Sequence, residues 1–300
     1  MKFIDKRRFH DREHSINVRF LKDCYTQDIT NPLPSPDSPK RSFDDFKKDE
    51  YRGGKEGKDG WLDLLLEEQE CRCCYCMKRL DTQNLSKINI EHVIPRSLNG
   101  ENGRDEYNYY TSNSEILRDY VMMSDEFAQK VFTNTDDIDR EEKMPHITAL
   151  ANLLAACNGK QDFIHTKMCC CNNHRGDKRI LPLMLMSQDN DAVIYDKNGL
   201  IIVNEDDGTL KDTIIRDLND KTLQDIRSVW YNLSRTDVDL EQAHNYNLKE
   251  RIIWFGNSYG TNFALLPQEV KKFAGINKEQ MFYWTLLMDY DWFYGYYKNH

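Results

Sequence analysis

Residues 88 to 100 read INIEHVIPRSLNG and set a carboxylate, Glu91, beside an imidazole, His92. An imidazole titrates near neutral pH and can take a proton from water, while a carboxylate beside it can hold a hard cation such as Mg²⁺. Together these groups are the parts needed for metal-assisted hydrolysis of a phosphodiester. Each also has an ordinary structural interpretation, as a partly buried histidine with satisfied hydrogen bonds and as a solvated carboxylate at a strand end.

Cysteines flank this pair in two groups that contain eight of the nine cysteines in the chain. Cys73 and Cys76 form a C-x-x-C knuckle in CRCCYCMKRL, and Cys157 with Cys171 could supply a second pair from a remote loop. Four thiolates make a closed, tetrahedral structural zinc site. Spacing alone does not choose the fourth ligand among three consecutive cysteines, 169 to 171. Buried cysteines that only pack in a core are the alternative, but the clustering favours zinc.

Other chemistries of cysteine and glycine motifs lack their sequence context. A thioredoxin-type redox pair needs its C-x-x-C near a βαβ pattern, which is missing here. A zinc deaminase needs H-x-E followed by P-C-x-x-C, whereas here the order is Glu-His and no proline precedes the knuckle. The glycine-lysine pairs of residues 53 to 60 do not have the spacing of a phosphate-binding loop.

The elements that must position these residues give an α+β chain. Apolar residues alternate with polar ones from Ile88 to Val93, which predicts a strand, and WLDLLLEEQ before the knuckle predicts a helix. The sequence around Asn198 and Gly199 predicts a hairpin with a type I′ turn. We divide the chain into an N-terminal segment with Pro/Gly-rich loops (1–59), a core with a helical insert (60–180, insert about 100–151) and a C-terminal hairpin plus aromatic-rich helical region (181–300). Within the insert, a helix is expected over residues 114 to 132.

Composition and charge limit the function. With 300 residues and 39% hydrophobic residues the chain can bury a real core. No run approaches the roughly 18 apolar residues of a membrane span, and no signal peptide is recognisable, so a cytoplasmic protein is expected. The net charge of −9 is unusual for a free-standing nucleic-acid binder. Binding of nucleic acid would need a local basic patch or a partner.

The order C-x-x-C, EHVIPRS, NLLAAC and CNNHRGDK resembles the motif of HNH endonucleases, the ββα-metal nucleases. More narrowly, residues 60 to 180 resemble the PtuB-type HNH proteins of Septu and retron-associated anti-phage systems. The resemblance implies a zinc-stapled ββα-metal core in a mainly helical chain. It also implies an endonuclease that hydrolyses DNA or RNA, tRNA included, and an SMC-like ATPase partner of the PtuA type.

Site roles follow from the same resemblance. His92 matches the general base, Glu91 a ligand of the catalytic Mg²⁺ or Mn²⁺, and Asn152 the middle asparagine that braces the loop. Asn172 stands where a usual HNH protein has histidine after the last cysteine, and we take it as the further metal ligand, with His174 as the alternative. Three basic residues are expected to contact phosphate: Arg96, Arg175 and Lys178.

A rival interpretation comes from a different class of function. In it the zinc-stapled domain only binds nucleic acid or protein, Glu91 and His92 are incidental, and another subunit carries the activity. The sequence does not separate the two.

Overall fold

The computed structural model describes the chain in several separate stretches. They are residues 1–25, 52–53, 60–98, 100–123, 143–162, 167–169, 171, 175, 178–186, 193–203, 218–235 and 289–300. In this part of the chain the fold mixes helices with small two-stranded sheets, which confirms the α+β class. None of the helices within these stretches is long and apolar enough to cross a membrane.

The α-helices are α1 (His10–Tyr25), α4 (Trp61–Glu68), α5 (Gly100–Asn113), α6 (Glu115–Tyr120), α11 (Lys221–Arg235) and α15 (Trp292–Asn299). The strands are β1 (Ile88–His92), β2 (Val121–Met122), β3 (Met144–Pro145), β4 (Leu153–Cys157), β5 (Lys160–Asp162), β6 (Lys167–Cys169), β7 (Val193–Tyr195) and β8 (Ile201–Val203). Short 3₁₀ turns are η1 (Lys6–Phe9), η2 (Leu85–Lys87), η3 (Leu150–Asn152) and η4 (Leu183–Leu185).

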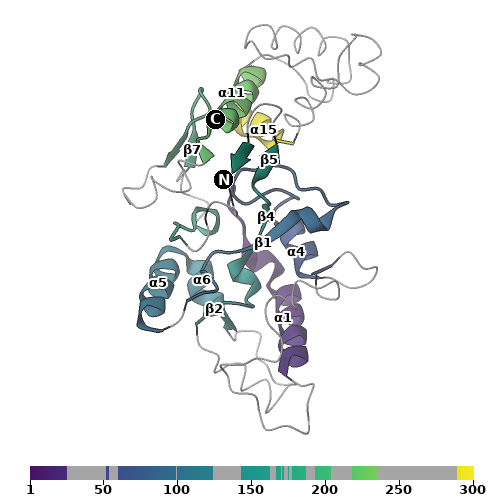
Figure 1. The fold of residues 1–300 in the computed structure, drawn as a ribbon, viewed down its shortest axis with the longest axis vertical. Coiled ribbons are helices and arrows are strands. Elements are labelled where there is room, and N and C mark those ends of the chain that lie inside the picture. Colours follow the sequence, from purple (N-terminus) through teal and green to yellow (C-terminus); the bar gives the residue numbers. More distant parts are fainter. Residues whose placement is uncertain are drawn as a thin grey trace.

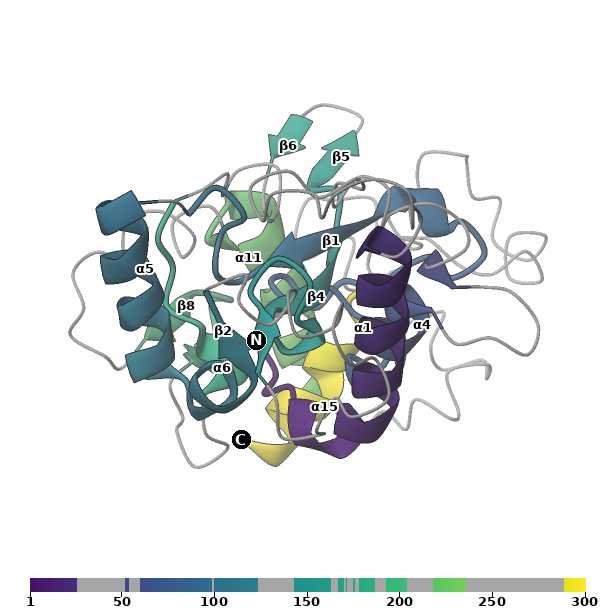
Figure 2. The same ribbon diagram turned by 90° about the horizontal axis from the view of Figure 1, so that it is seen from below.

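Strands β1 and β4 form the antiparallel pair at the centre of the molecule (Figure 1). The register sets Ile88 opposite Cys157 at one end and His92 opposite Leu153 at the other. Helices α1 and α4 lie on one side of the pair, and α5 and α6 lie on the other, as both ribbon views show (Figure 2). All five residues of β4 are buried, so this strand runs through the core.

Helix α4 forms where the sequence predicted a helix, because its apolar residues recur at helical spacing. Trp61, Leu62 and Leu65 are among its buried residues, and the helix packs against β4. Gln69, directly after the helix, mimics a strand partner: its amide nitrogen donates to the Ala155 carbonyl at 2.7 Å, and its carbonyl oxygen accepts from the Ala155 amide at 2.7 Å. This side chain therefore satisfies the outer edge of β4.

The insert after β1 is only partly as predicted. Helix α6 ends at Tyr120, and Val121 and Met122 turn into strand β2, which pairs in parallel with β3. The helix expected over residues 114 to 132 is therefore wrong at Val121 and Met122, because the backbone there pairs with Met144 and Pro145 instead. Residues 124–142 lie outside the described stretches.

The hairpin of β7 and β8 is confirmed, but its turn is not type I′. A type I′ turn needs positive φ at both central residues, and only Gly199, at +77°, has it; Asn198 does not. The Gly199 amide bonds to the Asp196 carbonyl at 2.9 Å, and the Asp196 amide bonds to the Leu200 carbonyl at 3.0 Å. This is the three-residue loop in which a type I turn is followed by a left-handed glycine.

Replacing Gly199 with alanine should lower the free energy of unfolding by about 3 kcal/mol, which chemical denaturation would measure. The residue has positive φ, and a Cβ atom would collide with the carbonyl oxygen of Gln224 in α11. Gly295→Ala is the matched control, because Gly295 lies in α15 and a Cβ there meets nothing within 4 Å. Equal stability of the two variants would contradict this account of the turn.

Candidate metal centre and hydrolytic site

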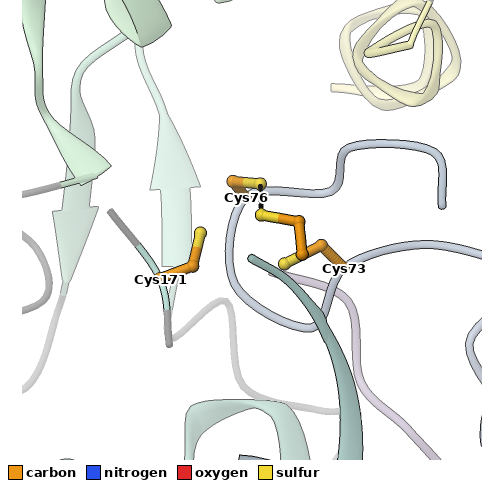
Figure 3. Close-up of side chains that lie close together, drawn as sticks. Cys73, Cys76 and Cys171 are labelled. Atoms are coloured by element: carbon orange, nitrogen blue, oxygen red, sulfur yellow. Dashed lines mark hydrogen bonds between the residues drawn. The ribbon is translucent and has the colours of Figure 1, made fainter. Parts of the chain in front are cut away.

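Four buried cysteines lie together beside the β1–β4 pair: Cys73, Cys76, Cys157 and Cys171. Their sulfur atoms all lie within 4.8 Å of one another. Figure 3 shows Cys73 and Cys76 of the knuckle close to Cys171, which comes from a separate segment. These are the four residues proposed from the sequence as zinc ligands, and among the described cysteines Cys171 is the one that completes the set.

The geometry of this cluster fits a tetrahedral zinc ion. A Zn–S bond of about 2.3 Å places neighbouring sulfurs of a tetrahedral site about 3.8 Å apart. The Sγ atoms of Cys76 and Cys157 lie 3.8 Å apart. Burial opposes ionisation of Cys73, but hydrogen bonds from neighbouring thiols, Cys157 first, outweigh it and hold its pKa well below the usual value. The thiolate is the form that binds metal.

The local backbone explains how the knuckle turns its thiols inward. The Cys73 amide bonds to the Lys78 carbonyl at 2.8 Å, and the Met77 amide bonds to the Cys73 carbonyl at 3.1 Å. Met77 and Cys171 both have positive φ, at 62° and 58°. Non-glycine residues in this region are uncommon and cost free energy, so the surrounding contacts must hold them there. A bound metal would provide such a constraint.

A second layer of contacts comes from residues 289 to 291, far away in the sequence. The hydroxyl of Tyr290 donates to the Cys76 sulfur at 3.9 Å. The Asp291 carboxylate accepts from Arg72 at 2.8 Å and from Arg79 at 2.6 Å. Groups of this kind orient metal ligands and shield them from water. The predicted boundary between core and C-terminal region is therefore crossed by contacts at the metal centre.

His92 lies at the end of β1 and is only 8% exposed. Its Nε2 atom lies 2.9 Å from the carbonyl oxygen of Ile147. Burial lowers the pKa of His92 to about 3, with a smaller opposing effect from the Ile147 hydrogen bond and further lowering by Arg96 and His146. The ring is therefore neutral at pH 7 and carries its proton on Nε2, which leaves Nδ1 as the basic nitrogen.

Asn152 braces the chain directly after β1. It is completely buried, and its side-chain oxygen accepts from the Ile94 amide at 2.7 Å. Its amide nitrogen donates to the Ile94 carbonyl at 3.0 Å and to the His146 carbonyl at 2.7 Å. The side chain thus bonds both the amide and the carbonyl of Ile94, as a neighbouring strand would. Among the described residues, all its hydrogen bonds are to main-chain atoms.

Glu91 and Arg175 form a buried ion pair beside His92. Arg175 is 1% exposed, and its guanidinium also donates to the main-chain oxygens of His92 and Val93, the latter at 2.5 Å. Burial alone would lower the pKa of Arg175, but the oxygens of Tyr75 and Glu91 outweigh it and the pKa is raised. Among the described residues the hydrogen bonds of Arg175 are all internal, and its predicted contact with a phosphate stays a prediction.

The remaining predicted residues lie in different surroundings. The side chains of Arg96 and Lys178 are exposed. Asn172 and His174 lie outside the described residues. No second group of three or more His, Cys, Asp or Glu side chains occurs in the described part of the chain. Glu91 is the type of ligand that Mg²⁺ prefers, and the described residues place no group of three such ligands around it.

Sequence reasoning missed one histidine of this region. His146 is buried and lies close enough to His92 for its charge to lower the pKa of that ring. The backbone of Arg96 and Met123 lies beside the His146 ring, but neither ring nitrogen makes a contact with hydrogen-bond geometry. Its place six residues before Asn152 was the only signal in the sequence.

Comparisons with models of known protein families, with curated proteins and with solved structures give no match. The function is therefore argued from the residues and the geometry.

Proposed function

We propose that this chain is a metal-dependent HNH-type endonuclease, built on a zinc-stapled ββα-metal core, that hydrolyses phosphodiester bonds of DNA or RNA. One observation carries the proposal. The Ile147 carbonyl holds the neutral ring of His92 at one end of β1, and the other end of β1 pairs with Cys157 of the cysteine cluster. Glu91 stands beside His92 on the same strand. A rigid support for a base of this kind is what hydrolysis requires.

The chain's own residues supply the base and its support. Because Nε2–H of His92 donates to Ile147, Nδ1 is the atom that would take a proton from the attacking water. Asn152 holds the Ile94 peptide two residues beyond the histidine. The cysteine cluster fixes the far end of the β1–β4 pair, so the histidine is held between two restrained points.

A divalent cation, Mg²⁺ or Mn²⁺, belongs to the proposal with Glu91 as one ligand and Asn172, or His174, as another. When bound, it would supply electrostatic stabilisation of charge that develops on the phosphate. The Glu91 carboxylate would have to be shared with Arg175, which already pairs with it.

The acidic balance of the chain suggests help from a partner. A nuclease that depends on a partner for substrate capture has no need of a strong positive field of its own. An SMC-like ATPase of the PtuA type, as the sequence resemblance implies, would fill this role in an anti-phage assembly. We place that assembly in the cytoplasm, since clustered free thiols fit a reducing compartment.

A second candidate function is a zinc-stapled binding subunit without catalysis. The observation that favours it is the ion pair of Glu91 with Arg175, which gives the carboxylate a structural partner. In that case the pair only stabilises the core, and another subunit cuts.

His92→Gln separates the two functions. Glutamine can still donate to the Ile147 carbonyl but cannot serve as a base, so cleavage by the assembly should fall by about 10² to 10⁴-fold while zinc content stays the same. The measurement is cleavage of plasmid DNA and of total tRNA by the chain with its ATPase partner, with Mg²⁺ and with EDTA. Equal cleavage by wild type and His92→Gln would assign the chemistry to another subunit.

A further inference from the structure

A second site lies away from the hydrolytic centre, in a cavity of about 490 Å³ between the β7–β8 hairpin and helices α11 and α15. Its volume falls within the range of about 300 to 1,000 Å³ found for small-molecule sites. The walls combine aromatic rings with positive charges. The side chains that matter below are Lys197, Tyr231, Arg235, Tyr296, Tyr297 and His300.

Helix α15 presents a ladder of flat rings along one face. Trp292 and Tyr296 are stacked with ring centroids 5.4 Å apart, and Tyr296 and His300 are stacked at 4.3 Å with planes 17° apart. The spacing of four residues places these rings one above another on the helix. Across the cavity, the Tyr231 ring of α11 meets Tyr297 edge to face at 5.3 Å. The cavity wall is thus built from rings of fixed orientation.

Hydrogen bonds to the hairpin hold these rings in place. The Tyr297 hydroxyl donates to the Asp196 carbonyl at 3.1 Å, and the Tyr195 amide donates to the Tyr296 hydroxyl at 3.2 Å. Within the ladder both faces of Tyr296 are covered, by Trp292 and by His300, so the open π surface is that of the exposed His300 ring at the end of the ladder. Because these rings are already fixed, the protein loses little conformational entropy when a flat ligand stacks on them.

The charges at the cavity favour an anion. Lys197 and Arg235 are exposed, and the Arg235 guanidinium lies 5.2 Å from the centre of the Tyr231 ring. The one carboxylate in the lining, Asp196, accepts hydrogen bonds from the amides of Asn198 and Leu200, at 2.8 and 2.7 Å, and is occupied within its own turn. Two cations beside stacked rings stand out in a chain whose net charge is −9.

We propose that this cavity binds a nucleobase together with its phosphate. The base would stack on the ring of His300 beside Tyr231, and the phosphate would pair with Arg235 and Lys197. An arginine over an aromatic ring suits a planar base beside an anion better than it suits an apolar peptide. The ligand is either a free nucleotide or an unpaired residue of a DNA or RNA strand. This binding does not depend on hydrolysis at His92.

The test uses the full chain carrying His92→Gln, so that no probe is cut. The probes are AMP and CMP, followed by calorimetry, and end-labelled single strands of eight nucleotides, DNA and RNA, followed by fluorescence anisotropy. His300→Ala and Arg235→Ala should each weaken binding about tenfold, and His300→Phe should retain it because a flat ring face remains. Lys298→Ala is the matched control, because it removes the same charge as Arg235→Ala. Lys298 is an exposed residue of α15 outside the cavity, and its ammonium nitrogen lies 5.7 Å from the centre of the Tyr294 ring.

The outcomes are distinct. Binding of AMP or CMP that depends on His300 and Arg235 supports a free nucleotide, and dependence seen with the strands alone supports a strand. Equal weakening by Lys298→Ala and Arg235→Ala would show general attraction of charge and overturn the proposal. So would the absence of binding by every nucleotide probe, or displacement of the labelled strand by a proline-rich peptide. Because Arg235 is exposed, its replacement leaves the fold intact, and a null result with it is informative.

Discussion

Removal of zinc, by a chelator or by Cys157→Ser, will unfold the region around β1 and β4. The four thiols of the cluster are buried within 4.8 Å of one another, and a structural zinc contributes on the order of 10 kcal/mol or more to a small domain. The whole stability of a typical domain is only about 5–15 kcal/mol. We therefore expect about one zinc per chain by elemental analysis, and loss of cooperative thermal unfolding when it is removed.

Cys74→Ala is the control for this prediction. Cys74 is buried in the same knuckle, between two members of the cluster, but it is not one of the four. Its replacement removes one buried thiol, as Cys157→Ser does, and should leave the zinc content unchanged. If Cys74→Ala and Cys157→Ser lose zinc equally, or if neither does, the tetrahedral assignment of the cluster is wrong.

The cysteine cluster shows how much of a metal centre spacing can predict. A knuckle and two remote cysteines were enough to propose four ligands, because a tetrahedral zinc site takes four ligands and Cys24 is the one cysteine outside the two groups. What spacing could not choose was the ligand among three consecutive cysteines. That choice depends on the backbone, since Cys171 takes positive φ and so turns its side chain differently from an extended residue.

Tertiary contacts explain what the sequence did not predict. The strand over Ile88 to His92 follows from alternation of apolar residues, but the alternation says nothing about which charged group will face it. Arg175 reads as a solvated residue beside a loop, because its partners Glu91, Tyr75 and Tyr110 come from remote positions. The hairpin turn is a smaller example of the same effect. Gly199 packs against Gln224 of α11, a contact with a remote residue, and the turn is of a type that the local sequence did not predict.

Arg175→Ala should lower the free energy of unfolding by about 3–5 kcal/mol, measured by chemical denaturation. The change would leave the Glu91 carboxylate buried without its counter-charge, and it would remove donors from the carbonyls of His92 and Val93. Arg179→Ala is the matched control, since Arg179 forms a bidentate pair with Glu106 near the surface, with a side chain 37% exposed. A surface pair of this kind contributes about 1 kcal/mol or less.

Pairing Arg175→Ala with Glu91→Gln then separates a structural pair from a catalytic one. If the two residues act only on stability, the double variant should recover part of the loss, because the buried charge is gone with its partner. Cleavage would behave differently under the proposed function, since Glu91→Gln removes a ligand of the cation and no second change at Arg175 can restore it. Recovery of cleavage together with stability would instead favour the binding subunit, in which the ion pair is part of the core alone.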